Sequence, residues 1–239
     1  MGMFKKTKRL VGNMLVSMKS PPAYLSWSQC GEDVILRSLF NDKKMKKISY
    51  LDIGASTPDS GDNTFLFYSG GSRGVCVEAN KALIPKLQRI RPKDKILNVG
   101  VTIGDEQEAD FFIFDCEGIS TFDKKEAEKR AASGRYKIIE TAKVPLISGN
   151  RLIKENFSTV PDLLSIDIEG LDLAVLQTLD FNTFPIPVIC VETCTYSENH
   201  IRPKDASIAQ YLVGKGYEIY ADTYINTIFV HAKWFHVES

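Results

Sequence analysis

The chain has 239 residues, of which 44% are hydrophobic and 25% are charged, so it can bury one substantial core. This composition excludes an intrinsically disordered, collagen-like or disulfide-scaffold protein. Thirty basic residues balance thirty acidic ones, and a chain without net charge has no general electrostatic affinity for nucleic acid. We therefore expect no nucleic-acid partner.

The five cysteines are odd in number and lack the C-x-x-C spacing of zinc sites, which fits a reducing compartment. No apolar run approaches the roughly 20 residues of a membrane-spanning helix. No A-x-A-like cleavage site follows the first hydrophobic stretch. The sequence therefore predicts a cytoplasmic protein.

Residues 1–27 differ in composition from the rest of the chain. Their first twenty positions contain five Lys and Arg residues without one acid, and apolar residues from Leu10 to Met18 recur at helical spacing. Two interpretations stay open: an amphipathic basic helix on a partner or on the inner face of an anionic membrane, and a solvated arm. We expect residues 28–239 to form a single domain.

From Ser28 onward, apolar runs alternate with helical patterns. Ser28 can cap a helix over residues 29–40, and further helical patterns cover residues 63–70, 81–90, 171–179 and 205–215. Continuous apolar runs are typical of strands that are buried on both faces. These runs cover residues 48–55, 73–79, 95–102, 163–169 and 188–193. The alternation predicts a parallel α/β sheet.

Two segments depart from this alternation. Residues 108–146 contain two β-type runs joined by a charged helical piece, which predicts a β insertion after the third strand. Residues 217–224 and 226–232 form two more strands that are too close for a crossover helix and must be antiparallel. We expect five parallel strands followed by an antiparallel C-terminal pair.

The carboxyl ends of the strands are the places to search for a ligand site, because ligands of open α/β sheets bind there. The first run ends with Asp52, Gly54 and Ala55, a turn where the backbone can approach a ligand closely. The turn lacks the G-x-G-x-x-G spacing that seats the pyrophosphate of NAD or FAD. Glu78 ends the second run, and an acid there can accept hydrogen bonds from ribose hydroxyls. A cofactor that contains adenosine but no pyrophosphate would explain both the loop spacing and the acid at position 78. S-adenosylmethionine is the commonest such molecule.

At this point the chain resembles a known family, the FkbM-type S-adenosylmethionine-dependent methyltransferases, from about Ser28 to about Val230. The similar blocks are SQCGEDVIL, YLDIGASTP with DNTFLFY, GVCVEAN, RPKDKILNVGV, STFDKKEA, LLSIDIEGLDLAVLQTLDF, VICVET and YADTYINTIFV, in the family's order. The resemblance implies a class I (Rossmann-like) methyltransferase fold with a mostly parallel seven-stranded sheet. It also implies bound S-adenosylmethionine and, most often, O-methylation of a saccharide or another small hydroxylated acceptor.

The resemblance also implies roles for individual residues. The first loop would face the methionine part of the cofactor, Glu78 would take the ribose hydroxyls, and Val101 with Thr102 would lie beside the adenine. Many relatives have Asn or His in the first loop, between the Gly-Ala pair and the proline, whereas this chain has Thr57 before the proline. A role that a histidine has there in relatives therefore cannot be assigned to Thr57. The cofactor-binding set is Gln29, Asp33, Asp52, Gly54, Ala55, Asn63, Thr64, Glu78, Val101, Thr102 and Asp167.

Three acids at the ends of the fourth and fifth strands are candidates for acceptor chemistry. Asp167 and Glu169 are two residues apart and would project from one face of a strand, and Glu192 ends the neighbouring strand. Converging carboxylates need a cation, a shared proton or a hydroxylated substrate between them. Magnesium is one such cation, but we favour a site without metal, because Glu169 has a competing role at the start of the following helix and no further acid neighbours it in the motif.

Methyl transfer needs a positioned acceptor and a base that removes its proton. His200 is the only histidine in a polar loop after a strand end and is the second candidate base; Tyr196, Asn199 and Arg202 of that loop are candidates for the acceptor wall. Two other classes of protein stay open: a non-catalytic cofactor-binding or interaction module, and a nicotinamide-dependent oxidoreductase.

Overall fold

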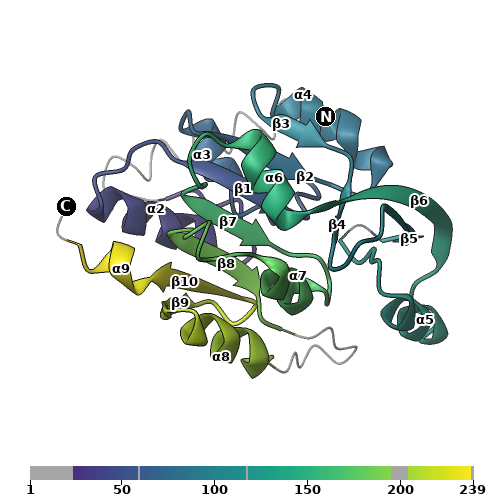
Figure 1. The fold of residues 1–239 in the computed structure, drawn as a ribbon. Coiled ribbons are helices and arrows are strands. Elements are labelled where there is room, and N and C mark those ends of the chain that lie inside the picture. Colours follow the sequence, from purple (N-terminus) through teal and green to yellow (C-terminus); the bar gives the residue numbers. More distant parts are fainter. Residues whose placement is uncertain (1–23, 59, 117, 195–203, 238–239) are drawn as a thin grey trace.

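The main feature of the computed structural model, which describes residues 24–58, 60–116, 118–194 and 204–237, is a seven-stranded sheet. Its strand order is β3-β2-β1-β7-β8-β10-β9 (Figure 1). Five neighbouring strands run parallel, namely β3, β2, β1, β7 and β8. Strand β10 is antiparallel to both of its neighbours. The bounds are β1 (Ser49–Ile53), β2 (Arg73–Val77), β3 (Lys95–Leu97), β7 (Leu163–Ile166), β8 (Val188–Glu192), β9 (Tyr217–Asp222) and β10 (Asn226–His231).

This topology confirms the expected fold. Five parallel strands are followed by a C-terminal pair in which β10 alone is reversed, as in the class I methyltransferase fold that the resemblance implied. None of the helices in the described ranges is both long and apolar enough to cross a membrane.

Helices cover both faces of the sheet, and strand side chains alternate between the two resulting cores. Leu51 and Ile53 of β1 join the core under α6, α7 and α8, whereas Tyr50 joins the core under α2 and α3. The helices are α2 (Glu32–Asp42), α3 (Phe65–Ser69), a 3₁₀ turn (Lys81–Leu83), α4 (Ile84–Ile90), α5 (Lys124–Ala132), α6 (Gly149–Asn156), α7 (Asp172–Thr178), α8 (Ala206–Gly214) and α9 (Ala232–Phe235).

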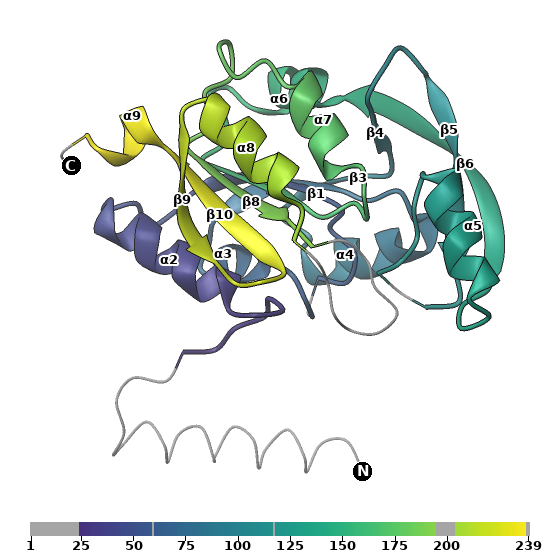
Figure 2. The ribbon, with the colours of Figure 1, turned by 90° about the horizontal axis from the view of Figure 1, so that it is seen from below.

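The insertion forms a second, three-stranded sheet beside the main one (Figure 2). It contains β4 (Gly100–Thr102), β5 (Glu108–Phe114) and β6 (Ile138–Ser148), with α5 between β5 and β6. The long strand β6 pairs parallel with β4 and antiparallel with β5. The expected β insertion is therefore present after the third strand.

Several local expectations were wrong. Helix α2 begins at Glu32 with Gly31 as its N-cap, so Ser28 is not the capping residue. The run 95–102 is two strands in two sheets, because the chain turns at Asn98, whose side chain donates to the carbonyls of Glu78 and Ala79. Helix α6 follows β6 directly and was not expected. Ser148 caps it by accepting a hydrogen bond from Arg151 N, and Leu152 and Ile153 bury its inner face.

Candidate active site

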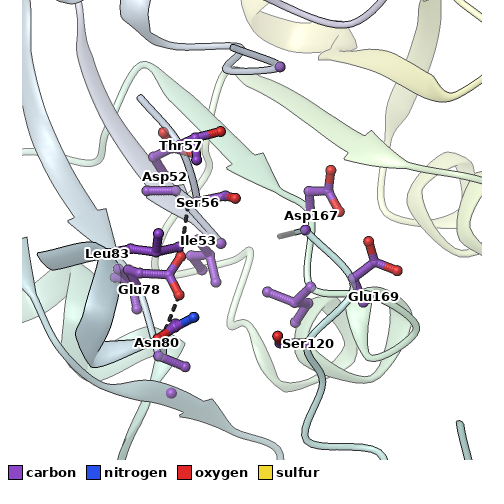
Figure 3. Close-up of a pocket in the computed structure, with 18 of the residues that line it drawn as sticks. Asp52, Ile53, Ser56, Thr57, Glu78, Asn80, Leu83, Ser120, Asp167 and Glu169 are labelled. Carbon is purple, nitrogen blue, oxygen red and sulfur yellow. Dashed lines mark hydrogen bonds between the residues drawn. The ribbon is translucent and has the colours of Figure 1, made fainter. Parts of the chain in front are cut away.

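A cavity of about 380 Å³ lies at the carboxyl ends of β1, β2 and β7. The insertion supplies another wall through Phe111, Phe114 and Phe122, aromatic residues that the sequence patterns did not single out as site residues. Figure 3 shows Glu78 and Asn80 on one side of the cavity and Asp167 with Glu169 on the other. The main sheet and the insertion therefore enclose the cavity together.

The loop after β1 approaches β7 so closely that one position must be glycine. Gly54 has a φ of 88°, and a Cβ atom on it would lie 1.9 Å from the carbonyl oxygen of Asp167. Ala55 follows on the cavity wall. Glycine is therefore required at position 54 by the packing of this loop against the backbone that follows β7, and the expected close approach of a ligand stays a prediction.

Glu78 lies directly after β2 with its side chain in the cavity wall. Its carboxylate accepts hydrogen bonds from Ser56 N at 2.8 Å and from Asn80 N at 2.7 Å (Figure 3). Burial raises the pKa of the Glu78 carboxyl, although these backbone donors favour its ionised form. Each oxygen has a further lone pair, so the carboxylate can still accept hydrogen bonds from a diol.

Asp52 forms the cavity floor and also belongs to a buried ionic network. Thr64 Oγ1 donates to Asp52 Oδ2 at 2.7 Å, and the guanidinium of Arg91 lies 3.4 Å from the same oxygen. Arg91 also pairs with Asp62 at 2.7 Å and with Asp94 at 2.8 Å. Burial raises the pKa of Asp62 to about 7. Nothing in the sequence pattern distinguishes Arg91 from the exposed basic residues near it.

Three residues of the cofactor-binding set do not line the cavity. Thr64 is fully buried and positions Asp52. Asp33 accepts hydrogen bonds from Ser26 Oγ, Trp27 N and Ser28 Oγ, and so fixes the segment that places Gln29 at the cavity. Thr102 bonds within the turn after β4. The other eight line it: Gln29, Asp52, Gly54, Ala55, Asn63, Glu78, Val101 and Asp167.

The three candidate acids do come together. One carboxylate oxygen from each of Asp167, Glu169 and Glu192 lies within 4.8 Å of the others. The expected strand geometry was wrong, however, because β7 ends at Ile166 and Glu169 has a left-handed backbone with a φ of 58°. Glu169 does not cap α7 either; Asp172 accepts from Ile168 N and Gly170 N and closes the loop.

Arg130 of α5 supplies a positive charge beside these acids. Its Nη2 lies 2.9 Å from Glu169 Oε2 and its Nε lies 3.1 Å from Glu126 Oε1. Three carboxylate oxygens at this spacing can ligate a divalent cation, but Arg130 already compensates one of them. A second cavity of about 260 Å³ adjoins these residues and shares Glu169 with the first. His200, Tyr196, Asn199 and Arg202 lie outside the described residues.

Cys76, Cys190 and Cys194 are buried, and burial raises the thiol pKa of Cys76 and Cys190, which makes them poor nucleophiles.

Comparison with known proteins identifies the family. Residues 52–219 match the methyltransferase FkbM domain, and the chain therefore belongs to the FkbM methyltransferase family. This match confirms the resemblance and, with it, the expectation of an S-adenosylmethionine-dependent methyltransferase. A search of curated protein sequences found no match.

The chain is also similar, at low identity, to several solved methyltransferases. A TehB-like enzyme from Corynebacterium glutamicum is 9% identical with a TM-score of 0.41, over 95% of this chain and 97% of that one. Magnesium protoporphyrin IX methyltransferase from Synechocystis is 9% identical with a TM-score of 0.43, over 96% and 83%. An O-methyltransferase from Bacillus cereus is 11% identical with a TM-score of 0.38, over 93% and 88%.

Proposed function

We propose that this protein transfers the methyl group of S-adenosylmethionine to a hydroxyl of a saccharide or a related small hydroxylated metabolite. The larger cavity binds the cofactor, and the smaller cavity beside Glu169 binds the acceptor. Methyl transfer itself follows from the family; the cofactor's contacts and the acceptor class are what we propose.

The charge of the larger cavity is the observation that supports the cofactor half of this proposal. Its described lining residues include the carboxylates Asp52, Asp62, Glu78, Asp167 and Glu169, but no Lys, Arg or His. Arg91 lies behind Asp52 and Asp62, fully buried. Such a wall attracts a ligand that carries a sulfonium and an ammonium group and repels a pyrophosphate. This contrast favours S-adenosylmethionine over NAD, as does the absence of a G-x-G-x-x-G loop.

The chain offers a residue for each part of such a cofactor. Glu78 would accept the ribose hydroxyls, and Val101 with the phenylalanines of the insertion would flank the adenine. When bound, S-adenosylmethionine supplies an activated methyl group, so the protein has only to align the acceptor, exclude water and remove a proton.

Asp167 is the base that the geometry supports best. It lines the cofactor cavity and lies beside Glu169 and Glu192, which line the smaller cavity. An acceptor hydroxyl between the two cavities would be within reach of Asp167 and of the methyl group. Neighbouring carboxylates raise one another's pKa values. The positive charge of Arg130, which pairs with Glu169, would oppose this effect among the three acids.

Calorimetric titration tests the cofactor half of the proposal. We expect S-adenosylhomocysteine to bind with micromolar or tighter affinity and NADH not to bind at all. Preferential binding of NADH would contradict the proposal. Release of S-adenosylhomocysteine with a panel of methyl glycosides tests the acceptor half, and cofactor binding without turnover of any hydroxylated acceptor would favour the non-catalytic module instead.

A further inference from the structure

Arg130 of α5 is buried, yet it contacts groups from the walls of both cavities. Its side chain is 1% exposed, and each of its three nitrogens has a partner. Nη2 donates to Glu169 Oε2 at 2.9 Å and Nη1 donates to the carbonyl of Ile119 at 2.5 Å. Nε donates to Glu126 Oε1 at 3.1 Å. A buried guanidinium with these bonds holds its partners in one arrangement, because its donors have a rigid planar geometry.

The partners of Arg130 belong to different parts of the site. The residues on both sides of Ile119, which are Gly118 and Ser120, line the cofactor cavity. Glu169 lines both cavities and lies on the same side of the cofactor cavity as Ser120 (Figure 3). Helix α5 itself lines only the smaller cavity. Arg130 therefore joins a wall of the larger cavity, an acid that both cavities share and a wall of the smaller cavity.

A second link between the insertion and Glu169 is weaker. Thr121 Oγ1 donates to the carbonyl of Glu169 at 3.4 Å, which is long for a hydrogen bond, and neither group is charged. The contact between Arg130 and Glu169 is shorter and charge-assisted. Segments that are joined by such contacts open and close as one unit. We therefore expect the wall at Ile119, the loop at Glu169 and α5 to form one unit with Arg130 as its link.

A ligand that stabilises one part of such a unit also protects the other parts from opening. We infer that Arg130 is a positioning residue that makes the smaller cavity depend on the larger one. When the cofactor binds, Arg130 transmits the ordering of the Ile119 wall and of Glu169 to α5. The acceptor then meets a wall that is already ordered, so the cofactor binds first and tightens the binding of the acceptor. The inference rests on the proposed function, because it takes the larger cavity as the cofactor site and the smaller one as the acceptor site.

Hydrogen–deuterium exchange tests this link, because α5 lines only the smaller of the two cavities. We expect S-adenosylhomocysteine at about 100 times its Kd to slow the exchange of α5 amides in the wild type about tenfold or more, where complete coupling gives about 100-fold. Arg130→Met should abolish this slowing, while residues 54–57 of the larger cavity stay protected. Lys124→Met, at an exposed position of the same helix, is the matched control and should respond like the wild type. Calorimetry gives the Kd for each protein.

The wild type alone can overturn the inference. If S-adenosylhomocysteine binds but leaves the exchange of α5 unchanged, the coupling is rejected and the proposed function is not. If the wild type does not bind S-adenosylhomocysteine at all, the proposed function is rejected together with the inference.

The variants decide whether Arg130 carries the coupling. Slowing of α5 that persists in Arg130→Met rejects Arg130 as the link and leaves Thr121 in its place. If Arg130→Met does not fold, Glu169→Gln replaces it, because this change removes the charge at the other end of the same contact. The slowing of α5 should then be lost in Glu169→Gln, and its persistence there rejects the inference.

Discussion

Glu78 combines two tasks, because its carboxylate ties the backbones of Ser56 and Asn80 together and lies in the cofactor cavity. We expect Glu78→Ala to weaken S-adenosylhomocysteine binding by about 2 to 3 kcal/mol, since two hydrogen bonds to a charged group are lost. Glu78→Gln, which keeps one acceptor oxygen, should lose less. Calorimetry measures both affinities.

Circular dichroism of the same Glu78 variants provides the control, because the fold should persist in both. Unchanged affinity in Glu78→Ala would show that the ribose binds elsewhere.

Asp167 is the proposed base, and its replacement should separate chemistry from cofactor binding. We expect Asp167→Asn to lower kcat about 100-fold or more with S-adenosylhomocysteine affinity nearly unchanged, because only proton removal and acceptor alignment are lost. A chelator should leave the wild-type rate unchanged, since Arg130 already compensates Glu169. Initial rates with an active acceptor measure both effects.

Glu155→Gln, on the exposed face of α6, is the matched carboxylate control for Asp167→Asn. Loss of activity with chelator that magnesium restores would favour a metal site at the three acids. Activity that survives both the chelator and Asp167→Asn would reject the three acids as a metal site and as the base. His200 would then be the next candidate base.

Some residues of the candidate site could be predicted from the sequence and others could not. Gly54 and Glu78 were predictable because strand ends and loop spacing place them, whereas Asp33 and Thr64 were assigned to the cofactor from their sequence blocks alone. Both are polar and adjacent to the site, but their partners are other parts of the chain. Arg91 and Arg130 were missed since nothing local distinguishes a buried arginine from a solvated one.

At the scale of elements, Arg91 joins β1, α4 and the segment before α3. We expect Arg91→Met to lower the free energy of unfolding by about 3 to 5 kcal/mol, because three buried carboxylates would lose their counter-charge. Urea denaturation measures this loss. Arg89→Met, at an exposed position of the same helix, should change stability by less than about 0.5 kcal/mol. Equal effects of the two substitutions would contradict the assignment.

Most elements could be predicted from apolar periodicity, but their boundaries depend on tertiary contacts. The apolar run 95–102 predicts one strand. In the structure the chain turns at Asn98, whose side chain donates hydrogen bonds to the carbonyls of Glu78 and Ala79, which are distant in sequence. Helix α6 has few apolar residues, and its capping residue Ser148 is also the last residue of β6, so no loop separates the strand from the helix. Only tertiary contacts decide such cases.

For the whole molecule, buried carboxyls give stability an unusual dependence on pH. Burial raises the pKa values of Asp52, Glu78 and Asp172, and that of Asp62 from 3.8 to about 7. The folded state therefore binds more protons than the unfolded state between these values. We expect the Tm to fall as pH rises from about 5 to about 7. Differential scanning calorimetry across this range measures the trend.

Acids with lowered pKa values, such as Asp180 and Asp222, lose their contribution only at lower pH. Burial lowers the pKa of His231, which gives a slope of the opposite sign in this range from a single group. Asp62→Asn should flatten the slope. A Tm that rises with pH in the wild type would contradict the prediction.

The basic N-terminal segment provides a prediction for the whole chain. We expect removal of residues 1–20 to leave S-adenosylhomocysteine affinity unchanged, because the described cavity residues begin at Gln29. If the segment binds an anionic membrane, the same deletion should abolish salt-sensitive sedimentation with phosphatidylserine vesicles. Loss of folding on deletion would place its apolar residues in the core.

The insertion leaves the body of the molecule at Thr102 and returns at Ser148, and these two residues are paired neighbours on β4 and β6. Their separation is one strand spacing, roughly 5 Å, whatever the length of chain between them. Lengthening such a loop costs little additional closure entropy. The segment between them, which supplies Arg130 and the α5 wall of the smaller cavity, can therefore change in length without moving its two ends apart. If the smaller cavity binds the acceptor as we propose, substitutions in this segment should alter acceptor choice while Asp52, Asn63 and Glu78 stay in place.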